Sequence, residues 1–207
     1  VGIYSLSYKI AGIALILSSS FNLAYRPVFF RLANSEEQET TRKNIYDFNN
    51  LFLVLLLFFF FALSFFSKEI IVLFFDSSYS SAYLYIPVIA LAYFLSVMGG
   101  LIARYFEQSK KMKQNMYIYI FSSLVNVAFN FLLIPSLGAF GAAYSTLLAM
   151  LFTVVAGYFY TKKHCYFVEF NWKTLAVVFS VLTLLFILFE FVLVFPLYYA
   201  LGAKTLL

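Results

Sequence analysis

The chain has 207 residues with few charges, one cysteine and one histidine, and each shortage excludes a class of protein. Only 11% of its residues are charged, whereas soluble domains carry roughly 25%. A single cysteine, Cys165, forms no intramolecular disulfide, and one cysteine with one histidine do not make a zinc cluster. The sequence therefore excludes a soluble globule, and it predicts no metal and no cofactor.

Apolar residues are abundant instead, at 64% of the chain, and 28 of them are phenylalanine. A water-soluble particle of this size cannot bury so much ring surface. The net charge is +5, but the basic residues fall in short clusters between apolar stretches, so no continuous face for nucleic acid is predicted. The chain starts at Val1 and enters an apolar segment at once, and we expect an internal piece of a longer polypeptide.

Membrane-spanning helices are predicted from the apolar windows, because a helix needs about 20 such residues to cross roughly 30 Å of hydrocarbon. We predict an all-α polytopic bundle of six spans plus a partial one. The windows are Ile10–Tyr25, Phe48–Phe66, Ala82–Ala103, Met116–Ile134, Ala139–Tyr160 and Thr174–Phe195, with the partial span at Pro196–Leu207. Pro135 and Gly138 mark a tight reversal. The polar stretch Arg31–Asp47 is expected to be a solvated cytoplasmic connection.

Basic residues predict the orientation, because lysine and arginine accumulate on the cytoplasmic side of a membrane protein. One set of alternate loops holds Arg31, Arg42, Lys43, Arg104, Lys110, Lys111, Lys113, Lys162, Lys163 and Lys173. The other set holds Lys68 and Lys204. The ten-to-two imbalance predicts that Val1 lies outside and that the first span runs inward.

Polar side chains within the spans are the candidate functional residues, because in hydrocarbon such groups face other helices or a water-filled cavity. The candidates are Lys9, Asn22 and Arg26 on the first span, Arg104 at the end of the third, and Asn126 and Asn130 on the fourth. Other interpretations stay open. The cations could be interface anchors, and the two asparagines of the fourth span could be structural contacts between helices. Glu190 is either a proton-linked carboxylate or interfacial. No phosphate-binding glycine loop, paired carboxylates or activated nucleophile occur, so no enzyme is predicted.

Two segments carry a resemblance to a known family. Val1 to Ile10 read VGIYSLSYKI, with Arg26 and Pro27 near the end of the span, and residues 126–135 and 138–146 read NVAFNFLLIP and GAFGAAYST. These segments resemble bacterial polysaccharide flippases of the O-antigen and teichuronic-acid transporter type, over roughly residues 1–163. The resemblance implies two six-helix lobes around a cavity that opens alternately to either side.

On this resemblance, residues 1–163 are five helices of the second lobe and residues 164–207 are additional, truncated helices. The first lobe would be missing from the chain. The implied function is the flipping of undecaprenyl-diphosphate-linked oligosaccharide across the bacterial inner membrane. Its partners would be that lipid-linked oligosaccharide and the lipid bilayer.

The candidate residues fall into two groups, one suited to the diphosphate of such a substrate and the other to its sugars. The cations Lys9, Arg26 and Arg104 suit the diphosphate, whereas Asn22, Asn126 and Asn130 suit sugar hydroxyls. The alternatives are a cation-coupled multidrug exporter or a lipid II flippase of the same superfamily. A membrane-embedded glycan polymerase or ligase ranks third, because the outer loops are short and lack the expected groups. A purely structural membrane subunit is the remaining interpretation.

Overall fold

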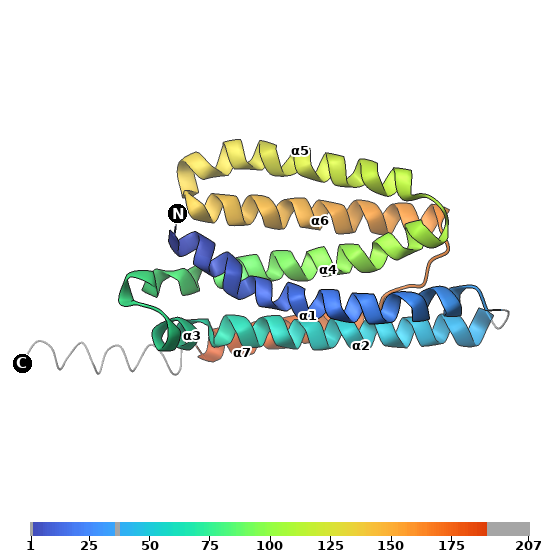
Figure 1. Cartoon of the computed structure of the whole chain (residues 1–207), viewed down its shortest axis with the longest axis horizontal. Helices are drawn as coiled ribbons and strands as arrows, with labels where there is room; N and C mark the ends of the chain where they lie inside the picture. The colour runs from blue at the N-terminus through green and yellow to red at the C-terminus, as the bar shows by residue number, and fades with distance from the viewer. Residues whose placement is uncertain (1, 36–37, 190–207) are drawn as a thin grey trace, which may run out of the picture. The chain divides into compact units, whose positions relative to one another are not determined.

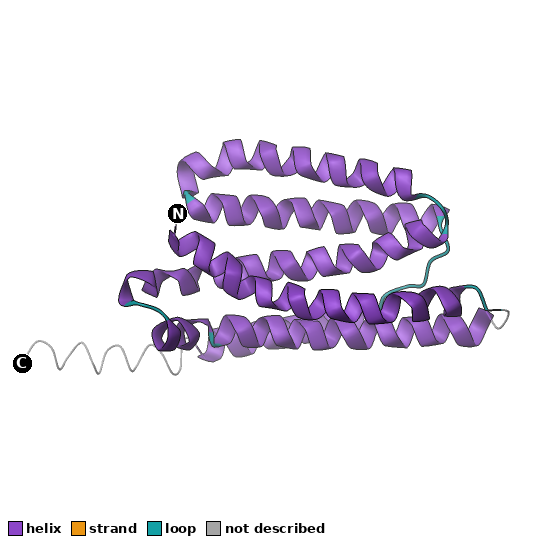
Figure 2. Ribbon diagram, in the orientation of Figure 1, coloured by secondary structure: helices purple, strands orange, loops and turns teal. Residues whose placement is uncertain are grey.

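The computed structural model describes residues 2–35 and 38–189, and every regular element in them is a helix (Figures 1 and 2). In chain order they are α1 (Gly2–Ala33), α2 (Gln38–Phe65), α3 (Ser67–Phe74), the 3-10 helix η1 (Ser77–Leu84), α4 (Ile86–Gln108), α5 (Met112–Leu137), α6 (Ala139–His164) and α7 (Trp172–Phe189). The predicted all-α class is confirmed.

The chain divides into two compact units, Val1–Phe170 and Asn171–Leu207. The first unit contains α1 to α6 and η1, and the described part of the second is α7. The segment that follows α6, Cys165–Phe170, thus belongs to the first unit. The domain division after residue 163, implied by the family resemblance, stays a prediction.

Within residues 2–35 and 38–189, five helices are long and apolar enough to cross a membrane: α1, α2, α4, α5 and α6. They confirm a polytopic bundle. The sixth predicted span, Thr174–Phe195, begins as α7, which is shorter over the residues described. Its last residues, the partial span Pro196–Leu207 and Glu190 lie outside the described part of the chain.

Two predicted boundaries are wrong. The connection predicted at Arg31–Asp47 is shorter than expected, because α1 runs to Ala33 and α2 starts at Gln38. Glutamate, glutamine, lysine and arginine favour helix, so the two helices extend past their apolar cores into polar surroundings. The third span starts at Ile86 rather than at Ala82, because the preceding residues form η1 and a proline occupies the first turn of α4.

Pro135 does not end its helix. α5 continues through it to Leu137, and the reversal falls at Gly138, whose φ of 57° is a backbone conformation that favours glycine. The N–H of Gly138 donates to the carbonyl oxygen of Ile134 at 2.8 Å and closes the last turn. A proline in that turn removes a single hydrogen bond, which the helix tolerates near its end.

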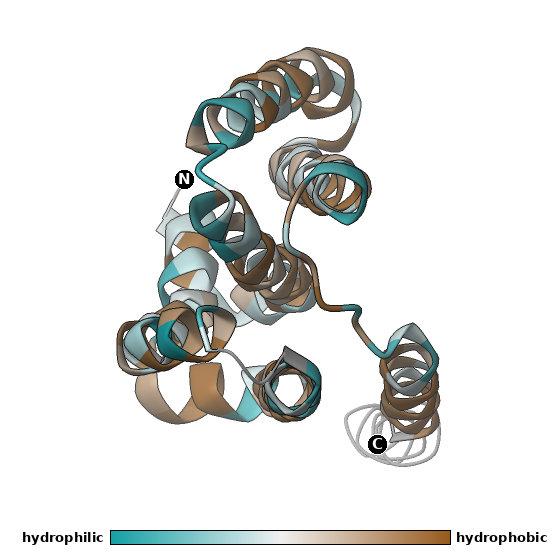
Figure 3. Ribbon diagram, turned by 90° about the vertical axis from the view of Figure 1, so that its right-hand side faces the viewer, coloured by the Kyte–Doolittle hydropathy of each residue, from teal (hydrophilic) through white to brown (hydrophobic). Residues whose placement is uncertain are grey.

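The basic segments of the first unit meet at one end of its helices. Gln108 Nε2 donates to Asn34 Oδ1 at 2.8 Å, which joins the ends of α4 and α1. Lys111 Nζ donates to the carbonyl oxygen of His164, which joins the α4–α5 turn to the end of α6. Figure 3 views the molecule from this end, with hydrophilic colour on the nearest turns and mostly hydrophobic colour on the helices behind. We call it the basic end.

Candidate functional site

Two polar pairs connect α1 and α4 near the basic end. On α1, Asn22 and Arg26 are four residues apart, and on α4, Arg104 and Glu107 are three apart, so each helix presents its two side chains on one face. Arg104 Nη2 donates to Asn22 Oδ1, and Arg26 Nη2 donates to Glu107 Oε1 in an ion pair. We call these four residues the α1–α4 ladder. Three of the six predicted site residues therefore lie together.

Arg104 is the buried member of the ladder, with 5% of the residue exposed. Its guanidinium carbon lies 4.7 Å from the centroid of the Tyr25 ring and 6.0 Å from that of Phe29, within cation–π range. The Tyr25 ring stacks in turn on Phe48 of α2, with centroids 3.9 Å apart. The aromatic side chains of α1 and α2 thus hold the guanidinium in place.

One donor nitrogen of that guanidinium remains unused. Arg104 Nη1 is buried and has no hydrogen-bond partner among the described residues, and the same is true of Tyr25 Oη. A buried donor without a partner costs about 1–3 kcal/mol, and more when it is charged. An anionic oxygen that reached Arg104 Nη1 would recover this free energy through a charge-assisted hydrogen bond.

Arg26 and Glu107 are the accessible members of the ladder, with 56% and 33% of their side chains exposed. Two arginines and one glutamate leave the ladder with a net charge of +1. Arg26 lies seven residues before the end of α1, and Arg104 lies four residues before the end of α4. At 1.5 Å per residue these separations are about 10 Å and about 6 Å along the helix axes. The excess positive charge therefore lies just inside the basic end.

Lys9 lies elsewhere. It precedes Arg26 by 17 residues on α1, which is about 26 Å along the helix axis. Its side chain is exposed near the opposite end of the first unit. The structure therefore separates the predicted cations into the ladder at one end of α1 and Lys9 at the other.

Asn126 and Asn130 lie on α5 and bond to each other rather than to the ladder. Asn130 Nδ2 donates to Asn126 Oδ1 at 3.0 Å, while Asn130 Oδ1 is buried without a partner among the described residues. Ser122, four residues before Asn126 on α5, takes part in helix packing. Its hydroxyl donates to the carbonyl oxygen of Ala149 and accepts from Thr153 Oγ1, both at 2.7 Å.

The sequence reasoning missed Glu107, because a carboxylate at the end of an apolar span resembles an ordinary polar boundary. Its spacing of three residues from Arg104 was the available signal. It also missed a buried polar contact beside the ladder. Asn49 Nδ2 of α2 donates to Tyr105 Oη of α4 at 3.0 Å, and Tyr105 Oη donates to the carbonyl oxygen of Val168 at 3.3 Å.

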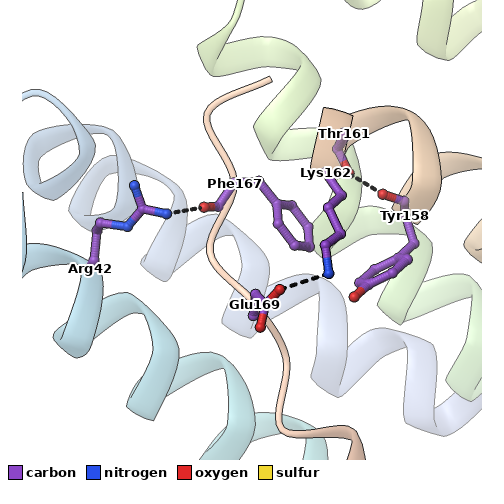
Figure 4. Close-up of polar contacts among 6 residues, drawn as sticks. All are labelled: Arg42, Tyr158, Thr161, Lys162, Phe167 and Glu169. Atoms are coloured by element: carbon purple, nitrogen blue, oxygen red, sulfur yellow. Dashed lines mark hydrogen bonds and ion pairs between the residues drawn. The ribbon is translucent and has the colours of Figure 1, made fainter. Parts of the chain in front are cut away.

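Val168 belongs to the segment Cys165–Phe170, which crosses the basic end after α6 and which we call the strap. Figure 4 shows Arg42 Nη2 of α2 donating to the carbonyl oxygen of Phe167, and Lys162 Nζ of α6 paired with Glu169 Oε1, both at 2.8 Å. Burial raises the pKa of the Cys165 thiol, which disfavours the reactive thiolate. The strap is a structural connection between α2, α4 and α6.

No group of three or more histidine, cysteine, aspartate or glutamate side chains among the described residues could hold a metal ion. The arrangement offers hydrogen-bond donors and positive charge instead. Such groups are chemically suited to an anion.

Five apolar helices with charged side chains held between them define an all-helical, multi-pass membrane protein. Residues 2–205 match the family model described as lipid II flippase MurJ. The match covers almost the whole chain, so the chain belongs to the lipid II flippase family MurJ. Comparison with curated proteins and with solved structures gives no match.

The family match confirms the flippase superfamily that the hairpin of residues 126–146 indicated. It does not support the O-antigen type specifically, and it corresponds better to the lipid II flippase that the sequence analysis kept as an alternative. The family is one of transporters, and its members are multi-pass proteins of the bacterial inner membrane. The chain is accordingly an inner-membrane protein.

Proposed function

We propose that the protein moves lipid II, a lipid-linked peptidoglycan precursor, from the inner to the outer leaflet of the bacterial inner membrane. One observation carries the proposal: the ladder holds an excess positive charge and the unused donor Arg104 Nη1 just inside the basic end of the helices. Membership of the lipid II flippase family supports the choice of substrate.

The chemistry of a lipid-linked diphosphate fits the ladder. Moving its charged group through hydrocarbon unaided costs many kcal/mol, because nothing there replaces the lost water. Guanidinium groups replace that water with charge-assisted, often bidentate hydrogen bonds. Arg26 is accessible to such a group, and Arg104 offers the nitrogen that has no other partner.

The positions along α1 fit a route across the bilayer. Lysine and arginine counts predict that the basic end is cytoplasmic, so the ladder would meet the diphosphate at the inner leaflet. Lys9, about 26 Å further along α1, would receive it near the far side of a hydrocarbon layer of about 30 Å. Asn126 and Asn130 are proposed to bond sugar hydroxyls, and a first lobe, carried by another part of the polypeptide, would form the opposite wall.

A second candidate is an O-antigen-type oligosaccharide on the same lipid diphosphate. The observation in its favour is the hairpin of residues 126–146, which resembles that of polysaccharide flippases. The two substrates share the diphosphate and differ in the saccharide head. The ladder therefore suits the diphosphate of either substrate, and only contacts with the saccharide head group would distinguish the two substrates.

Replacement of Arg26 by glutamine tests the role of the ladder. With R26Q introduced into the chromosomal gene, we expect transport to fall about tenfold or more, because a hydrogen bond to a charged group contributes about 1.5–3 kcal/mol and 1.4 kcal/mol is tenfold. The matched control is R31Q, an equal loss of charge on the exposed side of the same helix. Normal transport by R26Q at wild-type protein levels would overturn the proposal.

Depletion of the protein identifies the substrate. If lipid II is carried, depleted cells accumulate lipid II in the inner leaflet, measured as its protection from an externally added hydrolase. If the O-antigen-type oligosaccharide is carried, the lipid-linked oligosaccharide accumulates instead and lipid II does not.

A further inference from the structure

Glu107 occupies the position that a substrate anion would take. Its carboxylate accepts the hydrogen bond of Arg26, the most exposed cation of the ladder. A carboxylate and a phosphate group present oxygens to a guanidinium in similar ways, so the two compete for the same donors. The proposed function assigns Arg26 to the diphosphate, and both partners cannot hold the same donors at once.

We infer that Glu107 is a built-in competitor for the substrate diphosphate: it holds Arg26 between transport cycles, yields it when the diphosphate arrives and regains it when the diphosphate leaves. The inference rests on the proposed function and deepens it. Glu107 acts through Arg26 and is a positioning residue, since its own charge repels the substrate.

The geometry limits this competition to one of the two arginines. Glu107 lies three residues after Arg104 on α4, and Arg26 lies four after Asn22 on α1. The two pairs thus form successive steps between the helices, and Glu107 bonds Arg26 while Asn22 bonds Arg104. Arg104 keeps Nη1 without a partner among the described residues, but this nitrogen is buried, so an arriving anion first meets the exposed pair of Arg26 and Glu107.

The exposure of the pair makes it easy to displace. With 56% of the Arg26 side chain and 33% of the Glu107 side chain exposed, solvent screens the attraction, and ion pairs of this kind contribute only about 0–1 kcal/mol. A diphosphate carries more negative charge than one carboxylate, so it attracts the exposed guanidinium of Arg26 more strongly. The diphosphate therefore displaces Glu107 from Arg26 while it is bound, whereas it would not readily displace the partner in a deeply buried ion pair.

The competition by Glu107 affects the release of the diphosphate most. A lipid diphosphate held by two arginines without competition would leave slowly, and tight binding of a transported species lowers turnover. Glu107 is fixed on α4 beside Arg26, so it takes the guanidinium as soon as the diphosphate moves away. Rebinding at the basic end is thereby reduced.

The test uses the purified protein, expressed from its gene and reconstituted in nanodiscs, with farnesyl diphosphate as the binding probe. E107Q removes the negative charge, and E107D keeps the charge on a side chain one methylene shorter. We expect both to bind the probe about two- to fivefold more tightly, since the competing pair is worth at most about 1 kcal/mol. In a transport assay, we expect both to lower KM together with kcat.

E169Q is the matched control, because Glu169 is another ion-paired carboxylate at the basic end, bonded to Lys162 of α6. It should leave the dissociation constant for the probe unchanged. If E107Q tightens binding but E107D does not, general repulsion explains the effect and the inference fails. Unchanged binding in both Glu107 variants also overturns it.

R26Q separates the two proposals. If R26Q weakens probe binding while the Glu107 variants leave it unchanged, the inference fails and the proposed function stands. If R26Q binds the probe as tightly as the wild type, the diphosphate does not use this arginine and both proposals fail.

Discussion

The polar groups that join α1 to α4 differ in charge and exposure from those that join α5 to α6 in the hairpin. The ladder between α1 and α4 is charged, partly exposed and leaves the donor Arg104 Nη1 unused. The hairpin contact uses small residues and neutral hydroxyls instead. Ser122 Oγ, for example, bonds both Thr153 Oγ1 and the carbonyl oxygen of Ala149.

This difference bears on how closely each of the two helix pairs is packed. Gly141 of α6 approaches the backbone of α5 so closely that a Cβ atom there would lie 2.4 Å from the carbonyl oxygen of Leu133. Such close packing of small residues drives helix association in lipid, where hydrophobic burial contributes little. The hairpin is therefore closely packed through its backbone, whereas the ladder includes an exposed ion pair, which we propose that a substrate anion replaces.

The largest expected effect comes from filling the closest approach in the hairpin. G141A places a methyl group against backbone atoms that cannot rotate away, and we expect the free energy of unfolding to fall by about 3 kcal/mol. Unfolding of the purified protein in mild detergent, followed by circular dichroism against added denaturing detergent, measures it.

G100A is the control for that change, because nothing lies within 4 Å of a Cβ atom built on Gly100 of α4. Alanine favours helix over glycine by about 0.5–1 kcal/mol, so this variant should be as stable as the wild type or slightly more. Equal stability of G141A and G100A would remove the distinction between a closely packed hairpin and a ladder with an exposed ion pair.

An intermediate effect is expected at the buried contact beside the ladder. Y105F removes the hydroxyl that accepts from Asn49 Nδ2, and a buried amide without a partner costs about 1–3 kcal/mol. Y117F on α5, where 47% of the residue is exposed, should change the unfolding free energy by less than about 0.5 kcal/mol. If the two variants unfold at the same detergent concentration, the contact with Asn49 does not stabilise the α2–α4 packing.

The smallest expected effect is at the hydroxyl pair of the hairpin. T153V keeps the shape of the side chain and removes the bond to Ser122, which retains the carbonyl oxygen of Ala149 as its acceptor. Hydrogen bonds between membrane helices contribute about 0.6 kcal/mol on average. T183V serves as the control, because the hydroxyl of Thr183 donates to the carbonyl oxygen of Phe179 within its own helix. A loss well above 1 kcal/mol for T153V alone would mean that hydroxyls, rather than small residues, hold the hairpin.

Much of the fold could be predicted from the sequence, and the errors have a common cause. Apolar windows located five helices that are long enough to span the membrane. The polar extension of α2 back to Gln38 and the passage of α5 through Pro135 were not predicted. Both features depend on helix formation beyond the apolar core, which hydropathy does not measure.

The candidate site was predicted in part. Asn22, Arg26 and Arg104 were selected because polar groups within spans are costly, and the structure brings them together. Glu107 was not selected, although it forms the ion pair with Arg26 in the ladder. Lys9 was also selected, and it lies outside the ladder, because about 26 Å of helix axis separates it from Arg26.

The sequence by itself determined which segments enter the bilayer and which carry the excess of positive charge, because hydropathy and charge are local properties of about 20 consecutive residues. Only the tertiary structure decided which faces of α1 and α4 meet. Arg26 and Glu107 lie 81 positions apart in the chain. Their pairing, and the absence of a described partner for Arg104 Nη1, depend on how α1 and α4 cross, and no local sequence pattern contains that information.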